Sequence, residues 1–405
     1  MTEIEHHPRS RKKDSIKSLL ISGAEFPPQN GGISRFMGAV TSFLGPDQIC
    51  CLTAVASDPQ SRIHSRGPLE PRVYRRPAAF AKRRHIQMAG LGAATAEILL
   101  RERPQVVQVS TAHDGYIALW LHRWFKLPFV IYAHGNEILD AQKSTWPKPR
   151  LSLMQAARVL AISHFTGRLV QKAGVDPGRI EVVHPGCDVD RFQPCEPGIE
   201  LRQKLLSTQW RDRVILSVGR LVARKGHDMV IRALPRLLQE TPNLVYLIAG
   251  DGPYRTELDK LASSMGVRNH VSFAGQIADE LLPRVYALSD VFVMASREQP
   301  DLCEVEGFGL VFLEANACAK PVVAGRSGGI PDAVADGVSG FLVDPLDPED
   351  IARALSRILE SPELAVRLGR QGRARVLQEF TWTHFADRLR QILTAVVEGN
   401  SGEIA

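Results

Sequence analysis

The feature that most constrains this sequence is an alternation, kept along most of the chain, between short apolar runs rich in β-branched residues and amphipathic stretches. Parallel strands joined by crossover helices produce this pattern, so the sequence predicts an α/β protein. In the first half, the predicted strands are Ser18–Ser22, Ile49–Val55, Val106–Val109, Phe129–Tyr132, Val159–Ile162 and Ile180–Val183. The predicted helices between them include Ile33–Leu44, Met88–Arg101 and Thr166–Ala173.

The alternation breaks at Pro185–Pro197, which holds three prolines and one glycine and shows no clear periodicity. Such a segment is typical of an interdomain linker. The strands predicted after it are Val214–Val218, Val245–Ala249, Val271–Phe273, Val291–Met294, Val322–Ala324 and Gly340–Val343. The predicted helices are Asp228–Gln239, Tyr254–Met265, Asp279–Leu288, Leu310–Cys318 and a closing helix at Phe380–Val397. We therefore predict two Rossmann-like domains in tandem, with the active site in a cleft between them.

Composition excludes several classes of protein. With 44% hydrophobic and 23% charged residues, the chain is neither disordered nor fibrous. Its longest strongly apolar runs, Pro128–Ala133 and Val291–Ala295, are far shorter than the ~18–20 residues of a spanning helix. The polar N-terminus lacks the apolar region of a standard secretory signal, so we expect a cytoplasmic protein. The six cysteines form no Cys-x-x-Cys pair and are interpreted as reduced and mostly structural, with a catalytic thiol at Cys303 left open.

The basic residues that give the chain its formal net charge of +6 are concentrated in one segment. Between Arg62 and Arg84 lie eight basic residues and one acid, whereas the rest of the chain has 42 basic and 43 acidic residues. This segment and the aromatic and cationic stretch Leu119–Lys126 suggest docking on an anionic membrane, although an ordinary solvated loop is the alternative. Nucleic acid is disfavoured, because the aromatic residues of Leu119–Lys126 would then be needed as stacking platforms interleaved with the basic cluster itself. The candidate membrane or acceptor surface comprises Arg72, Arg75, Arg76, Lys82, Arg83 and Arg84.

The segment Glu306–Glu314, EGFGLVFLE, follows a predicted strand and opens a predicted helix. Glycines at that point let backbone amides approach a ligand, and a helix N-terminus favours negative charge. The segment thus predicts a phosphate or sugar-hydroxyl site. Its two glutamates could each accept hydrogen bonds from a different diol, although Glu314 could equally be a solvated helix residue.

A second cluster, GRLVARKG, directly follows the predicted strand at Val214–Val218. Arg220 and Lys225 lie in this one connection and can converge on one anion, such as a diphosphate. Simple solvation of both side chains is the alternative. The turn AGDGP, which contains Gly252, could present amides to the same ligand, or could carry glycine for backbone reasons only.

Two further turns lie in the first half. The glycine pair Gly31–Gly32 precedes a predicted helix, where it permits close backbone approach. The turn is not G-x-G-x-x-G and lacks the Lys-Ser/Thr of a P-loop, which disfavours hydride transfer and P-loop nucleotide hydrolysis. His134, in YAHGNE, stands at the carboxyl end of a predicted strand, as a binding group or as a helix-capping residue.

Together these segments resemble the retaining glycosyltransferases of the GT-B type, family 4 (group 1), and most of all the bacterial phosphatidylinositol-mannoside mannosyltransferases. The resemblance spans about Ile16 to Val397 and rests on FPPQNGGI, YAHGNE, HPGCDVDRFQP, SVGRLVARKG, IAGDGPYR, VSFAGQI, EVEGFGLVFLEA and VVAGRSGGIPDAV, in that order. It implies two Rossmann-like domains facing a central cleft, with a C-terminal helix that crosses back to the first. The implied parts are a flexible basic N-terminus (1–15), an acceptor-side domain (16–184), a linker (185–200), a nucleotide-sugar-binding domain (201–380) and the returning helix (381–405).

The resemblance also assigns roles. Arg220 and Lys225 would grip the donor diphosphate, while Glu314 would hold the ribose hydroxyls. Glu306 and the amides that follow it would hold the sugar ring, and His134 would line the transfer site. The implied catalytic residues are His134, Arg220, Lys225 and Glu306, and the further donor contacts are Gly31, Gly32, Gly252, Gln276, Ile277, Gly307, Phe308, Gly309, Leu310 and Glu314. Of these, Gln276 and Ile277 would lie against the nucleobase.

The implied reaction is hexosyl transfer from a nucleotide sugar, by preference mannose from GDP-mannose, to a lipid or glycan acceptor with retention of configuration. Preplaced cations stabilise the charge that develops on the leaving diphosphate. The sequence has no Asp-x-Asp beside a strand end, so we expect neither metal nor other cofactor. We assign no general base, since a leaving phosphate oxygen would take the acceptor proton. The expected location is cytoplasmic, peripheral on the inner face of the plasma membrane.

Several alternatives stay open at this level. The donor could be a UDP-sugar, and the acceptor could be phosphatidylinositol, a lipid-linked oligosaccharide or a soluble molecule. A nucleotide-sugar 2-epimerase and a pyridoxal-phosphate-dependent phosphorylase share the two-domain architecture but fit the loop motifs less well. A catalytically silent sugar-nucleotide-binding protein is a further possibility, although Arg220, Lys225 and Glu314 are all in place.

Overall fold

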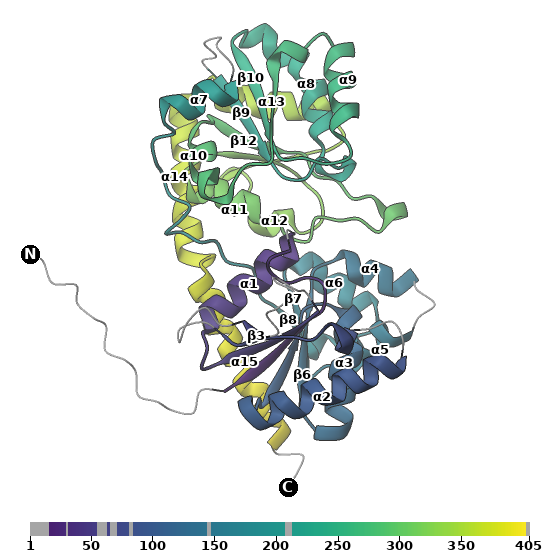
Figure 1. Ribbon diagram of the computed structural model, residues 1–405. Coiled ribbons are helices and arrows are strands. Elements are labelled where there is room, and N and C mark those ends of the chain that lie inside the picture. Colours follow the sequence, from purple (N-terminus) through teal and green to yellow (C-terminus); the bar gives the residue numbers. More distant parts are fainter. Residues whose placement is uncertain are drawn as a thin grey trace, which may run out of the picture. The chain divides into compact units, whose positions relative to one another are not determined.

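The computed structural model describes residues 16–29, 31–54, 63–64, 71–80, 84–143, 147–206 and 213–401. These residues form two mainly parallel β-sheets with flanking helices (Figure 1). The predicted flexible N-terminus, 1–15, lies outside the described residues. In the described part of the chain, no helix is long and apolar enough to cross a membrane.

The first sheet has the strand order β3-β4-β2-β1-β5-β6-β7-β8. Its strands are β1 (Ser18–Ser22), β2 (Ile49–Thr53), β3 (Ile63–His64), β4 (Val73–Arg75), β5 (Val106–Val109), β6 (Phe129–Ala133), β7 (Arg158–Ala161) and β8 (Ile180–Val182). Its helices are α1 (Gly32–Leu44), α2 (Arg84–Glu102), α3 (Gly115–Phe125), α4 (Asn136–Lys143), α5 (Pro147–Gln155) and α6 (His164–Lys172). Strand β1 pairs in parallel with both β2 and β5, so the strand order reverses at β1.

The second sheet has the order β11-β10-β9-β12-β13-β14, and all neighbouring strands are parallel. Its strands are β9 (Arg213–Val218), β10 (Leu244–Ala249), β11 (Val271–Gly275), β12 (Val291–Met294), β13 (Val322–Gly325) and β14 (Gly340–Val343). Its helices are α7 (Ile199–Leu206), α8 (His227–Glu240), α9 (Arg255–Ser264), α10 (Leu282–Ala287), α11 (Leu310–Ala317), α12 (Ile330–Ala333), α13 (Pro348–Leu359) and α14 (Pro362–Glu379). This is the strand order of a Rossmann fold.

The two predicted Rossmann-like sheets are therefore confirmed, and four strands, β1, β5, β12 and β14, have the bounds that the apolar runs predict. Strand β4 was not predicted, because two of its three residues, Tyr74 and Arg75, are not typical of an apolar run. It nevertheless pairs in parallel with β2, and Tyr74 and Arg75 are both buried. Pairing with a neighbour thus overrides the local polarity of this segment.

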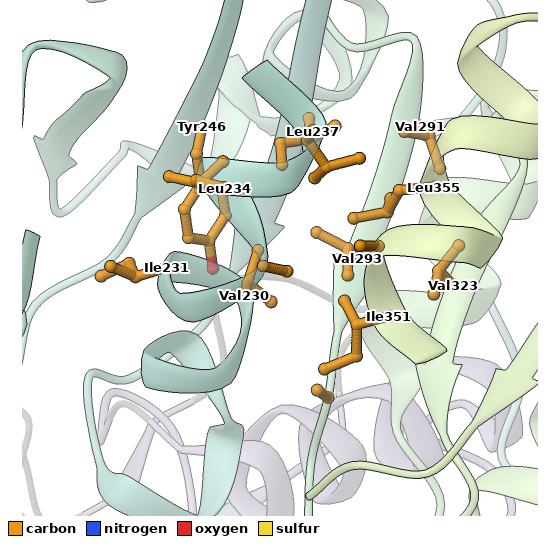
Figure 2. Close-up of a cluster of buried hydrophobic side chains, with 14 of the residues drawn as sticks. Val230, Ile231, Leu234, Leu237, Tyr246, Val291, Val293, Val323, Ile351 and Leu355 are labelled. Carbon is orange, nitrogen blue, oxygen red and sulfur yellow. The ribbon is translucent and has the colours of Figure 1, made fainter. Parts of the chain in front are cut away.

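The core of the second sheet lies between β9, β10, β12 and β13 and the two helices α8 and α13 (Figure 2). Val230, Ile231, Leu234 and Leu237 recur at helical spacing along α8, so they face the sheet together. Ile351 and Leu355 of α13 do the same on the adjoining strands. This packing fixes the strand ends from which the site loops leave.

The described residues divide into two compact units, one within residues 1–110, 114–130 and 389–405 and the other within 111–113 and 131–388. The last helix, α15 (Trp382–Ser401), belongs to the first unit from Leu389 onward. There Arg390 donates hydrogen bonds to Gln48 Oε1 (2.8 Å) and to the carbonyl of Phe43 (3.0 Å). The predicted return of the C-terminal helix is confirmed, and the predicted domain boundaries stay a prediction.

His227, the first residue of α8, is buried in a polar network inside the second unit. Its Nδ1 lies 3.0 Å from the hydroxyl of Tyr246, which lies 2.8 Å from the hydroxyl of Ser217. Nε2 of His227 has no hydrogen-bond partner among the described residues. Burial, and then the charge of Lys225, lower the pKa of His227 to about 4, so the ring is neutral.

This burial makes stability depend on pH. The folded-state pKa of His227 lies below the unfolded value of ~6.5. The unfolded state therefore binds more protons between these two values, and stability is lost as the pH falls from about 6.5 toward 4. Relative to His227→Asn, the wild type should lose about 1 kcal/mol between pH 7.5 and 5.5, or about 2–4 °C in melting temperature.

Thermal melts of both proteins at the two pH values measure this difference. The matched control is His384→Asn, which replaces an exposed histidine. If the difference in melting temperature between the wild type and His227→Asn is the same at both pH values, His227 is not a buried histidine with a lowered pKa.

Candidate functional site

The second sheet determines where a ligand can bind. Its strand order reverses between β9 and β12, which are neighbours in the sheet. In open α/β sheets, ligands bind beyond the carboxyl ends of the strands at such a reversal. The loop after β9 carries Arg220 and Lys225, and the loop after β12 leads to Glu306. The topology therefore brings these three predicted site residues to one edge of the sheet.

At this edge, Glu306 joins two cations in what we call the ion cluster: Arg224, Lys225 and Glu306. Lys225 Nζ lies 2.6 Å from Glu306 Oε2, and Arg224 Nη1 lies 2.8 Å from the same oxygen. The side chains of Lys225 and Glu306 are only 11% and 13% exposed, so water screens the pair weakly. The sequence predicted both residues as site members but not this pairing.

The members of the ion cluster keep one another charged, because each cation stabilises the carboxylate and the carboxylate stabilises Lys225. Burial disfavours the charged carboxylate of Glu306, but the charges of Lys225 and Arg224 outweigh it and hold the pKa of Glu306 below its usual range. Burial lowers the pKa of Lys225, and Arg224 and Arg220 add to this effect against the attraction of Glu306. The Nε of Arg224 also lies 4.0 Å from Glu304 Oε2, so two carboxylates balance the charges of Arg224 and Lys225.

Arg220 adds a third cation beside the cluster. Its charge acts on Lys225, which places it nearby, yet its side chain is exposed. Among the residues that the structure describes, the guanidinium of Arg220 has no hydrogen-bond or ion-pair partner. Arg220 is therefore the cation in excess over the carboxylates of Glu304 and Glu306, and an exposed guanidinium of this kind is suited to bind an anion such as a diphosphate.

Sequence reasoning missed Arg224. It stands in the same connection as Arg220 and Lys225, within the short 3-10 helix η4 (Ala223–Lys225). Its carboxylate partner, Glu306, lies 82 positions further along the chain, so the sequence around Arg224 does not show whether its side chain is paired or solvated. The available signal was three basic residues within one strand-to-helix connection.

The segment between Glu306 and α11 presents backbone amides. In the described structure, the N–H groups of Gly307, Phe308 and Gly309 donate no hydrogen bond to another residue. Helix α11 begins directly after them at Leu310, and there the amide of Phe312 donates to the carbonyl of Gly309 at 3.1 Å. Unused donors beside a cationic cluster are suited to bind phosphate or sugar oxygens, in line with the predicted role of this segment.

The loop after β12 packs directly on the loop after β6, where His134 stands. A Cβ built on Gly307 would lie 2.0 Å from the carbonyl oxygen of His134, so only glycine fits there. The side chain of Asn136 accepts a hydrogen bond from the amide of Val305 at 2.9 Å. The structure therefore brings His134 close to the Glu306 segment, although 172 positions separate the two residues in the sequence.

His134 itself is buried at the end of β6, and its ring stacks on Tyr132. Its backbone N–H donates to Glu137 Oε1 at 2.5 Å, so Glu137 holds the turn at the start of α4. Burial raises the pKa of Glu137, and backbone hydrogen bonds, including the one from His134, oppose the shift. The role of His134 as a binding group stays a prediction.

The turn after β10 interlocks with the turn after β9. A Cβ on Gly252 would lie 2.4 Å from the carbonyl oxygen of Leu221, and the amide of Leu221 donates to the carbonyl of Asp251 at 3.1 Å. This close approach explains the glycine by backbone packing. It also holds the loop that carries Arg220 and Lys225 in place, so Gly252 supports the candidate site through the position of that loop.

Three further predicted donor contacts lie after β11 and in α11. Glu314, in α11, accepts a hydrogen bond from the hydroxyl of Tyr286 at 2.7 Å and is only partly buried. Gln276 is exposed and Ile277 half-buried, directly after β11. Their predicted contacts with ribose and nucleobase stay predictions.

Gly31 and Gly32 belong to the other compact unit, where they begin α1 after β1. The order of the first sheet reverses at β1, so this turn stands at the equivalent topological position. A Cβ on Gly32 would meet nothing within 4 Å, and Gly31 has an extended φ of 174°. Neither glycine is required by the local packing.

The basic segment differs from the exposed cluster that the sequence suggested. Arg75 is buried in β4 and cannot lie on a docking surface, while Arg72 pairs with Glu102 at 2.7 Å and Arg76 pairs with Glu97. The segment is therefore partly neutralised by carboxylates of α2. Arg84 begins α2. Four other members, Arg62, Arg66, Lys82 and Arg83, lie outside the described residues.

Comparisons with known proteins cover nearly the whole chain. The family model described as Glycosyltransferase Family 4 matches residues 48–191, and the one described as Glycosyl transferases group 1 matches residues 200–375. A GDP-mannose-dependent alpha-(1-6)-phosphatidylinositol monomannoside mannosyltransferase of Mycobacterium tuberculosis is 31% identical over 394 residues, which cover 93% of this chain and 98% of the relative.

Two further matches add detail. A D-inositol 3-phosphate glycosyltransferase of Streptomyces scabiei is 35% identical over 308 residues, or 71% of this chain and 66% of the relative. Among solved structures, Anabaena Alr3699/HepE in complex with UDP and glucose has a TM-score of 0.76 at 21% identity, covering 94% of this chain and 100% of that one. At that identity, the structural match shows the fold alone.

Proposed function

The chain belongs to the family 4, group 1 glycosyltransferases, and from that premise we propose that it transfers a mannosyl group from GDP-mannose to a phosphatidylinositol-mannoside glycolipid. The observation that carries the proposal is the similarity to GDP-mannose-dependent relatives across both sheets and nearly all of the relatives' length. The ion cluster at the strand-order reversal of the second sheet supports it with a cationic site for the donor diphosphate.

In this proposal, Arg220 and Lys225 bind the diphosphate of the donor. The leaving nucleoside diphosphate gains negative charge as the glycosidic bond breaks, so fixed cations stabilise the transition state more than the ground state. Arg224 holds the carboxylate of Glu306 together with Lys225, which keeps that carboxylate at a defined place for the sugar hydroxyls. The unused amides of Gly307, Phe308 and Gly309 complete the donor contacts.

We further propose retention by attack from the face that the diphosphate leaves. The bond between the anomeric carbon and the phosphate oxygen breaks, the bond to the acceptor oxygen forms, and the acceptor proton passes to the leaving phosphate oxygen. This step needs no carboxylate pair of the glycosidase kind. The step also needs no metal in this proposal, because Arg220 and Lys225, in the loop after β9, supply the positive charge that a divalent ion would otherwise provide.

A second candidate acceptor is an inositol phosphate. The similarity to D-inositol 3-phosphate glycosyltransferases favours it, although that similarity covers less of the chain than the similarity to the mannosyltransferases. The two acceptor classes share the inositol ring and differ in the lipid, so one assay separates them.

A lipid acceptor requires access to a membrane surface, and we propose that the end of α3 provides it. Trp124 and Phe125 are 67% and 45% exposed, and Arg123 and Lys126 beside them are exposed as well. Exposed aromatic and cationic residues together suit the boundary of an anionic bilayer. This surface replaces Arg75 and its neighbours as the main docking candidate.

The first test is a transfer assay with the full-length protein, run with EDTA present. GDP-mannose and UDP-glucose are offered with phosphatidylinositol monomannoside, phosphatidylinositol or inositol 3-phosphate, and released nucleoside diphosphate and product mass are measured. We expect turnover with GDP-mannose and a phosphatidylinositol mannoside, at a rate that EDTA leaves unchanged. Turnover with UDP-glucose alone, binding without turnover, or a rate that Mg²⁺ or Mn²⁺ must restore contradicts the corresponding part of the proposal.

The second test addresses the ion cluster. Lys225→Ala should lower kcat by ~10²–10³, because it removes one preplaced cation from the leaving group. Lys225→Arg should recover part of the loss, since the charge remains. Lys260→Ala is the matched control, because Lys260 is 71% exposed and pairs only with Glu257 on the surface of α9. Near-normal turnover of Lys225→Ala, or equal losses in the control, would show that the site is elsewhere.

The third test is flotation with vesicles that contain phosphatidylglycerol. The double variant Arg123→Ala/Trp124→Ser should reduce vesicle binding at least ~5-fold at low salt, since one basic residue near the surface contributes ~1 kcal/mol. Leu346→Ser, which replaces an exposed leucine (64%) in the other compact unit, is the control. Binding that is absent, insensitive to salt, or equal in both variants argues against docking through α3.

A further inference from the structure

Outside the ion cluster, two histidines and one carboxylate converge in the unit that contains the second sheet. His164 is the first residue of α6, His184 follows β8, and Asp332 lies in α12. One ligand atom of each lies within 4.8 Å of the others. We call these three residues the His-His-Asp cluster. Their positions in the sequence match no metal-binding motif, so only the fold reveals the group.

The distances in this cluster are close to those of a metal site. Asp332 Oδ2 lies 3.0 Å from His164 Nδ1 and 3.1 Å from His184 Nε2. In a tetrahedral zinc site with bonds of ~2.0–2.1 Å, neighbouring ligand atoms are ~3.3–3.4 Å apart. The two histidine nitrogens lie within 4.8 Å of each other, and Asp332 Oδ2 also accepts a hydrogen bond from the backbone amide of His164 at 2.6 Å. Side-chain rotations about this carboxylate would bring the three atoms to bonding distance of one ion. The set of two imidazoles and one carboxylate suits Zn²⁺ and similar transition metals better than Mg²⁺ or Ca²⁺, which prefer oxygen ligands.

We propose that His164, His184 and Asp332 form a three-ligand site for a divalent transition metal, best suited to Zn²⁺, with water as the fourth ligand. The side chain of Asp332 is 16% exposed and that of His184 28%, whereas that of His164 is 64% exposed and leaves the site open to solvent. A closed structural zinc site would instead have four protein ligands.

The surroundings of the ligands hold them in place. The ring of His184 stacks on Phe308, with centroids 5.5 Å apart and planes inclined by 29°, and also contacts Phe380. Arg375 donates hydrogen bonds to the backbone carbonyls of Asp332 (2.8 Å) and Ala333 (2.7 Å), which fixes the end of α12. Ligands oriented by such neighbours lose little freedom when a metal binds.

The site adjoins the donor segment without belonging to it. Phe308, on which His184 stacks, contributes one of the unused amides, and the amide of Gly329, just before α12, donates to the carbonyl of Glu306 at 2.9 Å. A bound ion would therefore restrain the backbone around Glu306 and Phe308. It would stabilise the folded protein and take no part in the transfer step.

The test uses the full-length protein after removal of metal by a chelator. Micromolar Co²⁺ should give one equivalent of binding with the visible absorption of a four-coordinate site, Zn²⁺ should displace it, and Zn²⁺ should raise the melting temperature. Asp332→Asn and His164→Ala should each lower the affinity at least ~10-fold, since loss of a direct ligand costs no less than loss of an outer-shell partner. His164→Ala changes a mostly exposed side chain, so it tests ligation without disturbing the core.

Two controls identify the site. His6→Ala/His7→Ala removes the other histidine pair, adjacent in the sequence, and His270→Ala removes a histidine whose Nδ1 contacts the carbonyl of Leu244; both should bind Co²⁺ as the wild type does. No binding at micromolar metal, or binding that survives in Asp332→Asn and His164→Ala, overturns the proposal and leaves a hydrogen-bonded cluster. The assay contains neither donor nor acceptor, so its failure is distinct from failure of the transferase proposal.

Discussion

The ion pair between Lys225 and Glu306 is the interaction on which the site depends. It joins the loop after β9 to the loop after β12, and the reversal of strand order makes these loops neighbours. Either charge alone would be costly at that depth, with a penalty of several kcal/mol per buried ion. Arg224 shares the same carboxylate oxygen and also pairs with Glu304, so the buried charges are balanced, and the exposed guanidinium of Arg220 beside them is the cation in excess. A site of this kind is stable without a ligand and still attracts a polyanion.

The loops around this ion pair are held by close backbone contacts at glycines, where no side chain intervenes. Gly307 meets the carbonyl of His134, and Gly252 meets the carbonyl of Leu221, at distances that no Cβ would allow. These approaches fix two peptide planes against each other more tightly than side-chain packing could. The amides of Gly307 to Gly309 thus keep a defined direction, which is what electrostatic stabilisation of a developing charge requires.

The strands of both sheets could be predicted because a buried parallel strand is an apolar run, and the predicted strand Val291–Met294 has the bounds that the structure gives it. Members of the site could be predicted because glycines and charges stand directly after those runs. Pairings could not be predicted, since Glu306 lies 81 positions from Lys225 and the partner of Arg72, Glu102, lies 30 positions on. Strand β4 escaped prediction for the same reason, because Arg75 is buried only through the pairing of β4 with β2.

The charge of a segment in the sequence does not by itself give the charge of the surface that the segment forms. A run of eight basic residues suggests a positive surface, yet two carboxylates from elsewhere in the chain reduce its field: Glu102 pairs with Arg72 and Glu97 pairs with Arg76. The field of a folded protein is set by charges that are neighbours in space. The end of α3 has few cations but leaves them and two aromatic rings in solvent, so it is the stronger candidate for a lipid surface although its local sequence charge is small.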